Sequence, residues 1–312
     1  MKQNKKIIFI GTSEFASIIL ENLIKNDQAP HIIVSRPDKP RGRKKEIIDN
    51  QVVKFAKEKK TQLLQPEKIS SIFNLLKETD PDLIIVAAYG RIIPKKIIDL
   101  PRFGSINVHP SLLPKYRGPS PIQFTLLNGD QFTGASIMLM DDKMDHGPII
   151  AQEKHKISNR ETFLTLQKEL ADLSSKLLIK TLPQWLNQSI KPMEQNHQFA
   201  TFTKILTKKD GKIDWSKTAD DIDQQIRAFD SWPGTWAGWN NKILKIHKAH
   251  PAEIDLNNQQ FGQVFQDDYN NIIVRCGFGN LILDRLQMEG KKEMSAADFV
   301  RGHQNFIGSV LN

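Results

Sequence analysis

The stretch LIIVAA at residues 83–88 is apolar at every position and follows a segment, residues 69–77, that is typical of a helix. Residues 7–11 have the same continuous apolar character, and residues 13–25 after them carry apolar side chains at helical spacing. Strands that are apolar throughout and alternate with helices indicate a parallel sheet covered on both faces. The first part of the chain is therefore predicted to be a doubly wound α/β domain with a mostly parallel, Rossmann-like sheet.

A different pattern begins near residue 188. Residues 188–205 are polar and lack periodicity, which predicts a linker. Beyond them, an amphipathic helix is predicted at Thr218–Phe229. Short apolar segments separated by Asn, Asp and Gly follow it, at Ile243–His247, Gly262–Phe265, Ile272–Cys276 and Leu281–Leu286. This pattern is typical of a small antiparallel sheet or barrel. We therefore predict two domains, residues 1–187 and 206–312, joined by the linker 188–205.

Composition narrows the class of protein. A chain of 312 residues suggests about two domains, and its only cysteine, Cys276, excludes an internal disulfide framework. No apolar run is long enough to cross a bilayer. The apolar residues after Lys5 and Lys6 stop at Gly11, so they favour a first strand over a signal peptide. We expect a cytoplasmic protein with no membrane contact.

Positive charge is concentrated in the first two thirds of the chain. The net charge is +9; residues 1–205 hold 31 Lys and Arg against 21 Asp and Glu, and residues 206–312 hold 13 against 14. Residues 36–60 alone contain ten basic and four acidic side chains. Such a cluster suits a phosphate backbone, and the alternative is an ordinary solvated surface.

Two polar side chains are placed together in a segment of predicted strand. Residues 105–109 read Ser-Ile-Asn-Val-His, and side chains alternate between the faces of a strand, so Asn107 and His109 point the same way. Pro110 and Pro114 exclude regular structure and predict a rigid loop beside them. An amide that donates to a developing oxyanion and a ring that handles a proton suit acyl transfer.

A carboxylate follows the next predicted strand, residues 135–140. Asp141–Asp145 comes after the carboxyl end of that strand, where open α/β sheets bind ligands. Asn107, His109 and Asp145 are therefore the candidate catalytic residues. The remaining histidines are scattered and form no cluster with metal-ligand spacing, so we predict no metal and no prosthetic group.

The chain resembles the bacterial methionyl-tRNA formyltransferase family, a branch of the folate-dependent formyltransferases. The resemblance covers nearly the full length. It is carried by GTSEFA at residues 11–16, PDKPRGR at 37–43, AYG at 88–90, the run from Ile106 to Gln123, DHG at 145–147 and RAFDSWPG at 227–234. One departure is Ser13, where the family usually has proline.

This resemblance implies a reaction and a set of roles. The formyl group of the co-substrate 10-formyltetrahydrofolate would pass to the α-amino group of methionine on initiator tRNA. Asn107 would stabilise the oxyanion, His109 would donate a proton, and Asp145 would orient His109. The residues implied for folate binding are Tyr89, Gly90, Arg91, Ser111, Leu112, Leu113, Pro114, Met140 and Asp141. The second domain would be an OB-like barrel.

The resemblance also implies how the tRNA is held. Residues 37–45 contain two prolines, a glycine and five basic side chains, which excludes a helix and suits contact with RNA phosphates. The family uses this loop at the acceptor stem, and Arg43 matches its key arginine. The residues that we predict for tRNA binding are Arg41, Arg43, Lys44, Lys45, Lys242, Lys245 and Lys248. No obligate protein partner is implied.

Three other functions stay open at this stage. The same chemistry could act on a small amine, such as an amino-sugar nucleotide. A nicotinamide oxidoreductase is disfavoured because residues 11–16 hold one glycine where the dinucleotide fingerprint needs three. A non-catalytic RNA-binding module would leave Asn107, His109 and Asp145 without a role.

Overall fold

The computed structural model describes residues 5–38, 40–41, 46–47, 49–158, 160–252 and 259–312, with the backbone alone at 40, 41, 46 and 47. The chain divides into two compact units. The first comprises Met1–Pro121, Phe132–Ile157 and Gln167–Thr203, and the second comprises Ile122–Gln131, Ser158–Leu166 and Lys204–Asn312. The domain boundaries at residues 187 and 206 remain a prediction from the sequence.

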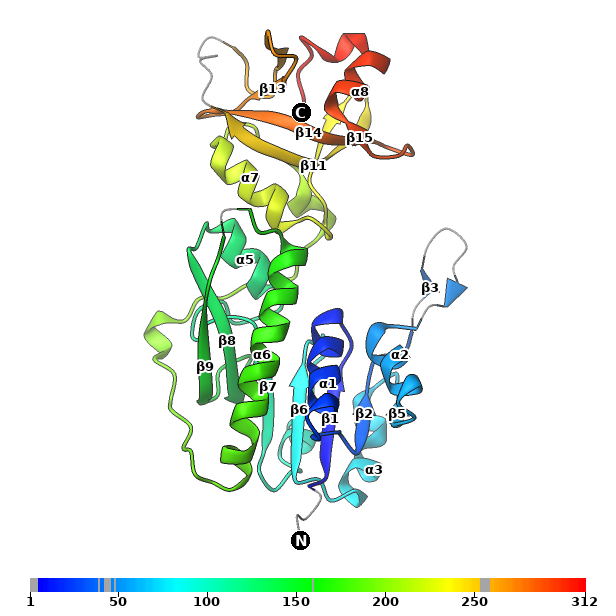
Figure 1. Ribbon diagram of the computed structural model, residues 1–312, viewed down its shortest axis with the longest axis vertical. Coiled ribbons are helices and arrows are strands. Elements are labelled where there is room, and N and C mark those ends of the chain that lie inside the picture. Colours follow the sequence, from blue (N-terminus) through cyan, green and yellow to red (C-terminus); the bar gives the residue numbers. More distant parts are fainter. Residues whose placement is uncertain (1–4, 39, 42–45, 48, 159, 253–258) are drawn as a thin grey trace. The chain divides into compact units, whose positions relative to one another are not determined.

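A seven-stranded sheet forms the centre of the first unit (Figure 1), in the order β5-β2-β1-β6-β7-β8-β9. Its strands are β1 (Ile7–Gly11), β2 (Ile32–Val34), β5 (Gln62–Leu64), β6 (Leu83–Ala87), β7 (Ser105–His109), β8 (Phe132–Leu139) and β9 (Ile149–Lys156). The strands from β5 to β7 pair in parallel, and β8 and β9 continue the sheet antiparallel. The predicted mostly parallel α/β fold is confirmed.

The helices of this part of the chain are α1 (Glu14–Lys25), α2 (Gln51–Glu58), α3 (Phe73–Glu78), α4 (Lys95–Ile98), α5 (Pro121–Leu127) and α6 (Phe163–Leu186), with 3-10 turns at Ile69–Ile72 and His197–Phe199. Two of these helices, α1 and α3, overlap the ranges 13–25 and 69–77 that the sequence predicts. Ser13 caps α1, since its hydroxyl accepts a hydrogen bond from the Ala16 amide at 3.4 Å. The departure from the family's proline thus supplies an N-cap.

Two elements differ from what the local sequence pattern suggests. Residues 158–161 have the S-x-x-E form of a capping box, which predicts the start of a long helix there, but α6 begins at Phe163; the Glu161 carboxylate accepts a hydrogen bond from the Ser158 amide at 2.9 Å. Strand β9 was not predicted, because four of its eight side chains are exposed and its charged residues hide the strand pattern.

The strand order reverses direction between β1 and β6. The chain moves outward from β1 to β2 and β5, then returns to pair β6 with the other edge of β1. Open α/β sheets bind ligands at such a switch point. Gly11 ends β1 there, and a Cβ on it would lie 2.8 Å from the Ala87 carbonyl oxygen. The two strands can approach this closely because residue 11 has no side chain.

The predicted basic loop contains a short antiparallel pair, β3 (Pro40–Arg41) with β4 (Glu46–Ile47). Three of the residues predicted to bind tRNA, Arg43, Lys44 and Lys45, lie outside the described residues, as does the side chain of Arg41.

The second unit is built on an antiparallel sheet with strand order β10-β11-β14-β13-β12, and β15 pairs with β14. Its elements are 3-10 turns at Lys208–Gly211 and Gln304–Phe306, α7 (Ala219–Ala228), β10 (Trp236–Trp239), β11 (Lys242–Ala252), β12 (Val264–Gln266), β13 (Ile272–Arg275), β14 (Asn280–Met288), β15 (Met294–Ser295) and α8 (Ala296–Gly302). This agrees with the smaller, mainly antiparallel domain that the sequence predicts. None of the described helices is both long enough and apolar enough to span a membrane.

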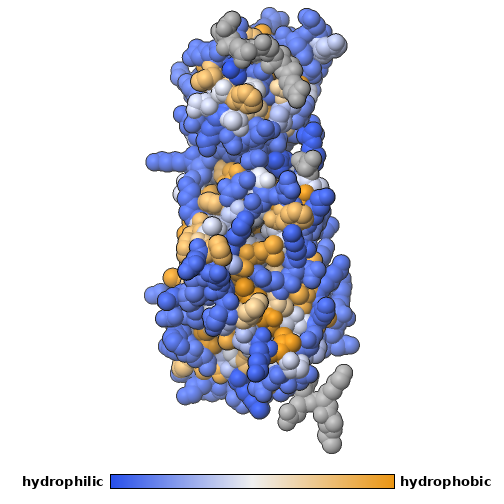
Figure 2. Space-filling model, turned by 90° about the vertical axis from the view of Figure 1, so that its left-hand side faces the viewer, coloured by the Kyte–Doolittle hydropathy of each residue, from blue (hydrophilic) through white to orange (hydrophobic). Residues whose placement is uncertain are grey.

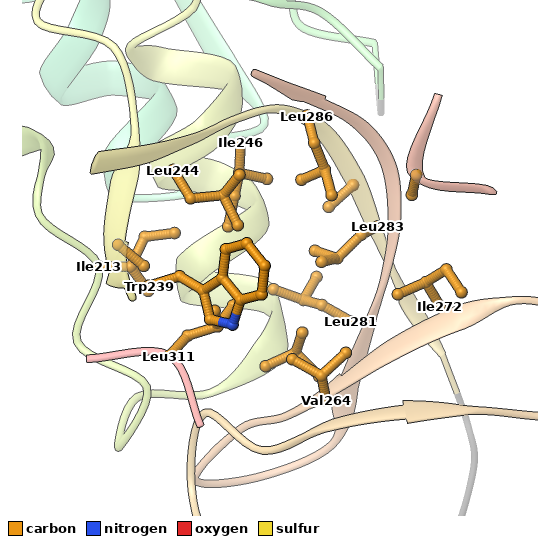
Figure 3. Packing of buried hydrophobic residues seen from close by; sticks show 14 of the residues in the cluster. Ile213, Trp239, Leu244, Ile246, Val264, Ile272, Leu281, Leu283, Leu286 and Leu311 are labelled. Atoms are coloured by element: carbon orange, nitrogen blue, oxygen red, sulfur yellow. The ribbon is translucent and has the colours of Figure 1, made fainter. Parts of the chain in front are cut away.

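Trp239 lies in the middle of the core of this unit (Figure 3), among side chains from β11, β12 and β14. Its ring contacts Phe299 and Phe306 edge-on, with centroids 5.6 and 5.2 Å away. Its indole N–H donates to the Ser309 hydroxyl at 2.9 Å. The large ring is therefore both packed and hydrogen-bonded, as a buried tryptophan requires.

We expect Trp239→Ala to lower the free energy of unfolding by about 3–5 kcal/mol, because it leaves a cavity the size of an indole ring. Urea unfolding followed by circular dichroism would measure this. Trp232→Ala is the matched control, since Trp232 is 48% exposed and should cost far less. Equal losses for the two variants would contradict this account of the core.

Candidate active site

Strand β7 places the predicted amide and imidazole at the carboxyl edge of the sheet. Asn107 pairs with Val86 of β6 on one side and Met138 of β8 on the other, and His109 pairs with Ser136. Asn107 is partly exposed, whereas His109 is 4% exposed. The two side chains are therefore held by a strand that is fixed on both edges.

The Asp145 carboxylate joins the predicted catalytic residues. Its Oδ1 accepts a hydrogen bond from Asn107 Nδ2 at 3.1 Å, and its Oδ2 accepts one from the Gly118 amide at 2.7 Å. The same Oδ2 lies 3.7 Å from His109 Nδ1. The structure thus brings together all three residues that the sequence predicted to share one centre.

The hydrogen bonds of His109 fix which ring nitrogen can exchange a proton. Nε2 lies 3.0 Å from the Tyr116 carbonyl oxygen, which can only accept, so Nε2 carries a hydrogen. Nδ1 is the nitrogen that faces Asp145. A proton that arrives on Nδ1 would therefore form an imidazolium beside a carboxylate, and the carboxylate would stabilise that charge.

Backbone conformations that side chains rarely adopt gather around these groups. The φ angles are 42° at Ala88, 61° at Tyr116 and 48° at Asp145. These left-handed conformations cost energy in residues other than glycine and occur often at functional sites. Gly147, two residues after Asp145, leaves no room for a side chain, since a Cβ would lie 2.0 Å from the Leu139 carbonyl oxygen. The conformation of this loop therefore determines where the Asp145 carboxylate points.

The loop after His109 is held by internal hydrogen bonds. The Ser111 hydroxyl donates to the Lys115 carbonyl at 2.7 Å, and the Ser136 hydroxyl donates to the Ser111 carbonyl at 2.6 Å. Leu113 is buried against Met138 and Ile149. These contacts support a structural role for Ser111 and Leu113, and folate contact by Ser111, Leu112, Leu113 and Pro114 stays a prediction.

The other residues predicted for folate lie at the ends of β6 and β8. Tyr89 is 2% exposed and belongs to a buried apolar cluster, and Met140 packs against that cluster. Gly90 is exposed and Arg91 is partly exposed. The carboxylate of Asp141 accepts from the Lys143 amide at 2.9 Å and lies 2.7 Å from His146 Nδ1. Folate contact at these positions also stays a prediction.

Three residues that sequence reasoning did not single out hold Asp145 in place. Gln195 Nε2 donates to the carbonyl oxygens of Asp145 and Gly147, at 2.9 and 2.7 Å. Its Oε1 accepts from the buried Arg117, with Nη2 at 2.7 Å, and the same Nη2 lies 2.8 Å from His197 Nδ1. Because a guanidinium only donates, this nitrogen of His197 is an acceptor.

Charge and stacking reinforce this network. The rings of His146 and His197 stack, with centroids 4.2 Å apart. Desolvation lowers the pKa of His197, and the nearby His146 and Arg117 lower it further. Burial likewise lowers the pKa of Arg117, although Asp145 and Asp141 act in the opposite direction. His197 therefore favours the neutral form that can accept from Arg117.

Gln195 lies in the predicted linker, residues 188–205. This segment buries a polar side chain and exposes apolar ones. Gln195 is buried, whereas Met193, Phe199 and Phe202 are 66–68% exposed. Figure 2 looks onto the left-hand side of the view in Figure 1, where β9 and residues 188–203 lie. It shows apolar side chains among charged ones there. No periodicity in the sequence could have revealed a segment that buries its amide and exposes its apolar residues.

The lysines predicted for tRNA contact in the second unit, Lys242, Lys245 and Lys248, are exposed on β11. A bulge between Ile246 and Ala249 interrupts the alternation of this strand.

Comparisons with known proteins identify the family. The profile described as "Formyl transferase" matches residues 5–182, and "Formyl transferase, C-terminal domain" matches residues 205–304. The methionyl-tRNA formyltransferase of Caldicellulosiruptor saccharolyticus is 40% identical over 98% of this chain and 99% of its own length. The chain belongs to the methionyl-tRNA formyltransferase family.

Solved structures share the fold at lower sequence identity. HypX from Aquifex aeolicus, in complex with tetrahydrofolic acid, has a TM-score of 0.64 and 15% identity over 99% of this chain and 48% of its own. An N-formyltransferase from Helicobacter canadensis, in complex with folinic acid and dTDP-3-aminofucose, has a TM-score of 0.65 and 20% identity over 89% of this chain and 99% of its own. Both likenesses extend across most of this member of the family.

We expect Gln195→Met to lower both stability and formyl transfer, because it leaves two backbone carbonyls and Arg117 without their partner. The loss of buried hydrogen bonds should cost about 1–3 kcal/mol, measured by urea unfolding. Gln198→Met is the matched control, since Gln198 is exposed in the same segment. Unchanged transfer in a folded Gln195→Met variant would contradict the positioning of Asp145 by Gln195.

Proposed function

We propose that the protein transfers the formyl group of 10-formyltetrahydrofolate to the α-amino group of methionine on initiator tRNA, for translation initiation. The observation that carries the proposal is the Asp145 carboxylate, which accepts from Asn107 and faces His109 Nδ1. Membership of the methionyl-tRNA formyltransferase family supports the same substrates. As the location we propose the cytoplasm, where translation takes place.

The reaction exchanges one carbon–nitrogen bond for another. An α-amino group titrates near pH ~7.7–8, so a useful neutral fraction exists at neutral pH. Its nitrogen attacks the formyl carbon, the carbonyl oxygen becomes an oxyanion, and the bond from carbon to the folate nitrogen then breaks. The amine loses one proton and the folate nitrogen gains one. The protein must therefore align the amine, stabilise the oxyanion and carry a proton.

The three candidate side chains can divide these tasks. The Asn107 amide has two N–H groups, and Asp145 accepts from one of them. We assign the second N–H to the oxyanion. His109 Nδ1 faces Asp145, so we assign this pair to the proton that leaves the amine and returns to the folate nitrogen.

For the tRNA, we propose that Arg41, Arg43, Lys44 and Lys45 contact the acceptor stem. Lys242, Lys245 and Lys248 would contact phosphates elsewhere on the tRNA, since exposed lysines can neutralise a backbone despite a near-neutral domain. We retain residues 1–187 as the catalytic domain and 206–312 as the tRNA-binding domain in this proposal.

We expect label from 10-[¹⁴C]formyltetrahydrofolate to appear on methionyl-tRNA and not on free methionine. An arm with a dTDP-linked amino sugar tests the rival substrate, which is motivated by the shared fold of a formyltransferase bound to such a nucleotide. Label on the sugar alone would overturn the proposed substrate, and label on neither acceptor would overturn the proposed reaction.

We expect Asn107→Ala to lower turnover about 10²–10³-fold, because it removes one oxyanion donor. Single-turnover transfer at saturating substrates would measure the chemical step. Asn128→Ala serves as a control for loss of an amide at a position away from β7. Near-normal turnover in both Asn107→Ala and Asp145→Ala would exclude these residues from catalysis.

A further inference from the structure

One imidazole supplies an acceptor to the buried arginine beside the candidate site. Arg117 is 3% exposed, and its Nη2 carries two hydrogens. Gln195 Oε1 accepts from this nitrogen at 2.7 Å, and His197 Nδ1 lies 2.8 Å from it. Both partners are uncharged acceptors. Arg117 Nη2 therefore has an acceptor for each hydrogen only while His197 Nδ1 carries no hydrogen of its own.

The guanidinium in turn fixes the side chain of Gln195. Arg117 Nε also donates to Gln195 Oε1, at 3.2 Å, so two N–H groups of one planar group hold this oxygen. The nitrogen at the other end of the Gln195 amide donates to the carbonyl oxygens of Asp145 and Gly147. A continuous chain of hydrogen bonds thus leads from His197 to the backbone of Asp145.

The ring of His197 is held in one orientation. It stacks on the ring of His146 with an angle of 7° between the two planes. His146 Nδ1 lies 2.7 Å from the carboxylate of Asp141, which can only accept, so this nitrogen donates. Stacking on a ring that is itself fixed keeps His197 Nδ1 facing the guanidinium. His197 is exposed, so its ring can exchange protons with the solvent.

The surroundings of His197 oppose a positive charge on its ring. Desolvation lowers the pKa of His197 below its ordinary value of 6.5. Three neighbouring side chains lower this pKa further, namely His146, Arg117 and Lys143, and Glu194 acts in the opposite direction. The ring is therefore mostly neutral at pH 7 and gains a proton in more acidic solution. An N–H of His197 would then face an N–H of Arg117, and two like charges would be in contact.

We propose that His197 is a positioning residue for formyl transfer, which proceeds at full rate only while the His197 ring is neutral. Protonation of the ring breaks its hydrogen bond to Arg117 and repels the guanidinium. Gln195 then loses its fixed partner, and the backbone of Asp145 loses the contacts that hold it. The inference rests on the proposed function. His197 acts through Arg117 and Gln195, not on the reacting atoms.

A purely structural histidine is the competing interpretation. The stacked rings would then only pack two loops together, and protonation would lower stability without moving Asp145. The direction of His197 Nδ1 favours positioning, because it is aimed at a guanidinium that is bound to Gln195. The conformation of Asp145 also favours it. A φ of 48° is unfavourable in a residue other than glycine and persists only where neighbouring contacts impose it.

The first test needs no substrate. We expect NMR of the full-length protein, labelled with ¹³C-histidine and ¹⁵N, to show the His197 ring titrating between about pH 7.5 and about pH 5. The side-chain amide signals of Gln195 should shift with the same midpoint. They should stay constant in His197→Asn, because an amide oxygen can accept in place of Nδ1 but does not titrate.

The second test is single-turnover formyl transfer to methionyl-tRNA over the same pH range. Because only the neutral ring holds Arg117, the rate of His197→Asn divided by the wild-type rate should rise about twofold at the NMR midpoint and about tenfold one pH unit below it. Ionisation of the amine and of His109, and loss of formyl folate in acid, are common to both proteins and cancel in this ratio.

Two further variants complete this test. His197→Leu offers no acceptor and should be about tenfold slower than the wild type at about pH 7.5. His31→Asn is the matched control, since His31 is exposed elsewhere on the same unit, and its rate should equal that of the wild type at each pH.

Each outcome decides the inference. A rate ratio that stays constant while His197 titrates overturns it, and so does a Gln195 amide that does not respond. A ring that remains neutral down to about pH 5 overturns it as well. If His197→Asn fails to fold, the midpoints of His197 and Gln195 in the wild type still decide. Absence of transfer to methionyl-tRNA by the wild type removes the proposed function, whereas the NMR titration tests the link from His197 to Gln195 separately.

Discussion

The candidate site depends on one carboxylate that accepts two hydrogen bonds and faces a ring. Asp145 accepts from the Asn107 amide and from the Gly118 backbone, and its second oxygen faces His109 Nδ1. Asn107 and His109 lie on β7, whereas Gly118 and Asp145 lie on two separate loops. A partly buried carboxylate loses hydrogen bonds to water, and these donors replace them. The same contacts that stabilise the charge also align the amide and the imidazole.

Holding that carboxylate requires a backbone that is unfavourable by itself. Asp145 and Tyr116 have positive φ angles, and neither is glycine. Such strain persists only where surrounding contacts determine the conformation. Gln195 supplies them from a distant segment, since it binds the carbonyl oxygens of Asp145 and Gly147 and is itself held by Arg117. In this way the hydrogen bonds of Gln195 hold the loop that carries Asp145 beside the sheet.

The sequence allowed the fold to be predicted where a single pattern determines an element. The continuous apolar strands β1 and β6 and the i, i+2 pair Asn107 and His109 depend on local periodicity, and the structure agrees with each of them. Strand β9 was missed because its exposed charged residues break the alternation, and α6 begins two residues after the S-x-x-E pattern at residues 158–161. The contacts of Gln195 are with residues far away in sequence, which no local pattern reports.

The polar segment after α6 contacts the candidate site as well as connecting two parts of the chain. Residues 188–203 contact β9 and the loop after His109. Such contacts leave no periodic pattern of apolar residues in the sequence. Met193 pairs with Ile149 of β9, and Phe202 pairs with Arg117. A catalytic fragment that ended at residue 187 would keep Asn107, His109 and Asp145, yet it would lose the amide that fixes the backbone of Asp145. The candidate site therefore includes a segment whose sequence alone suggests only a connection.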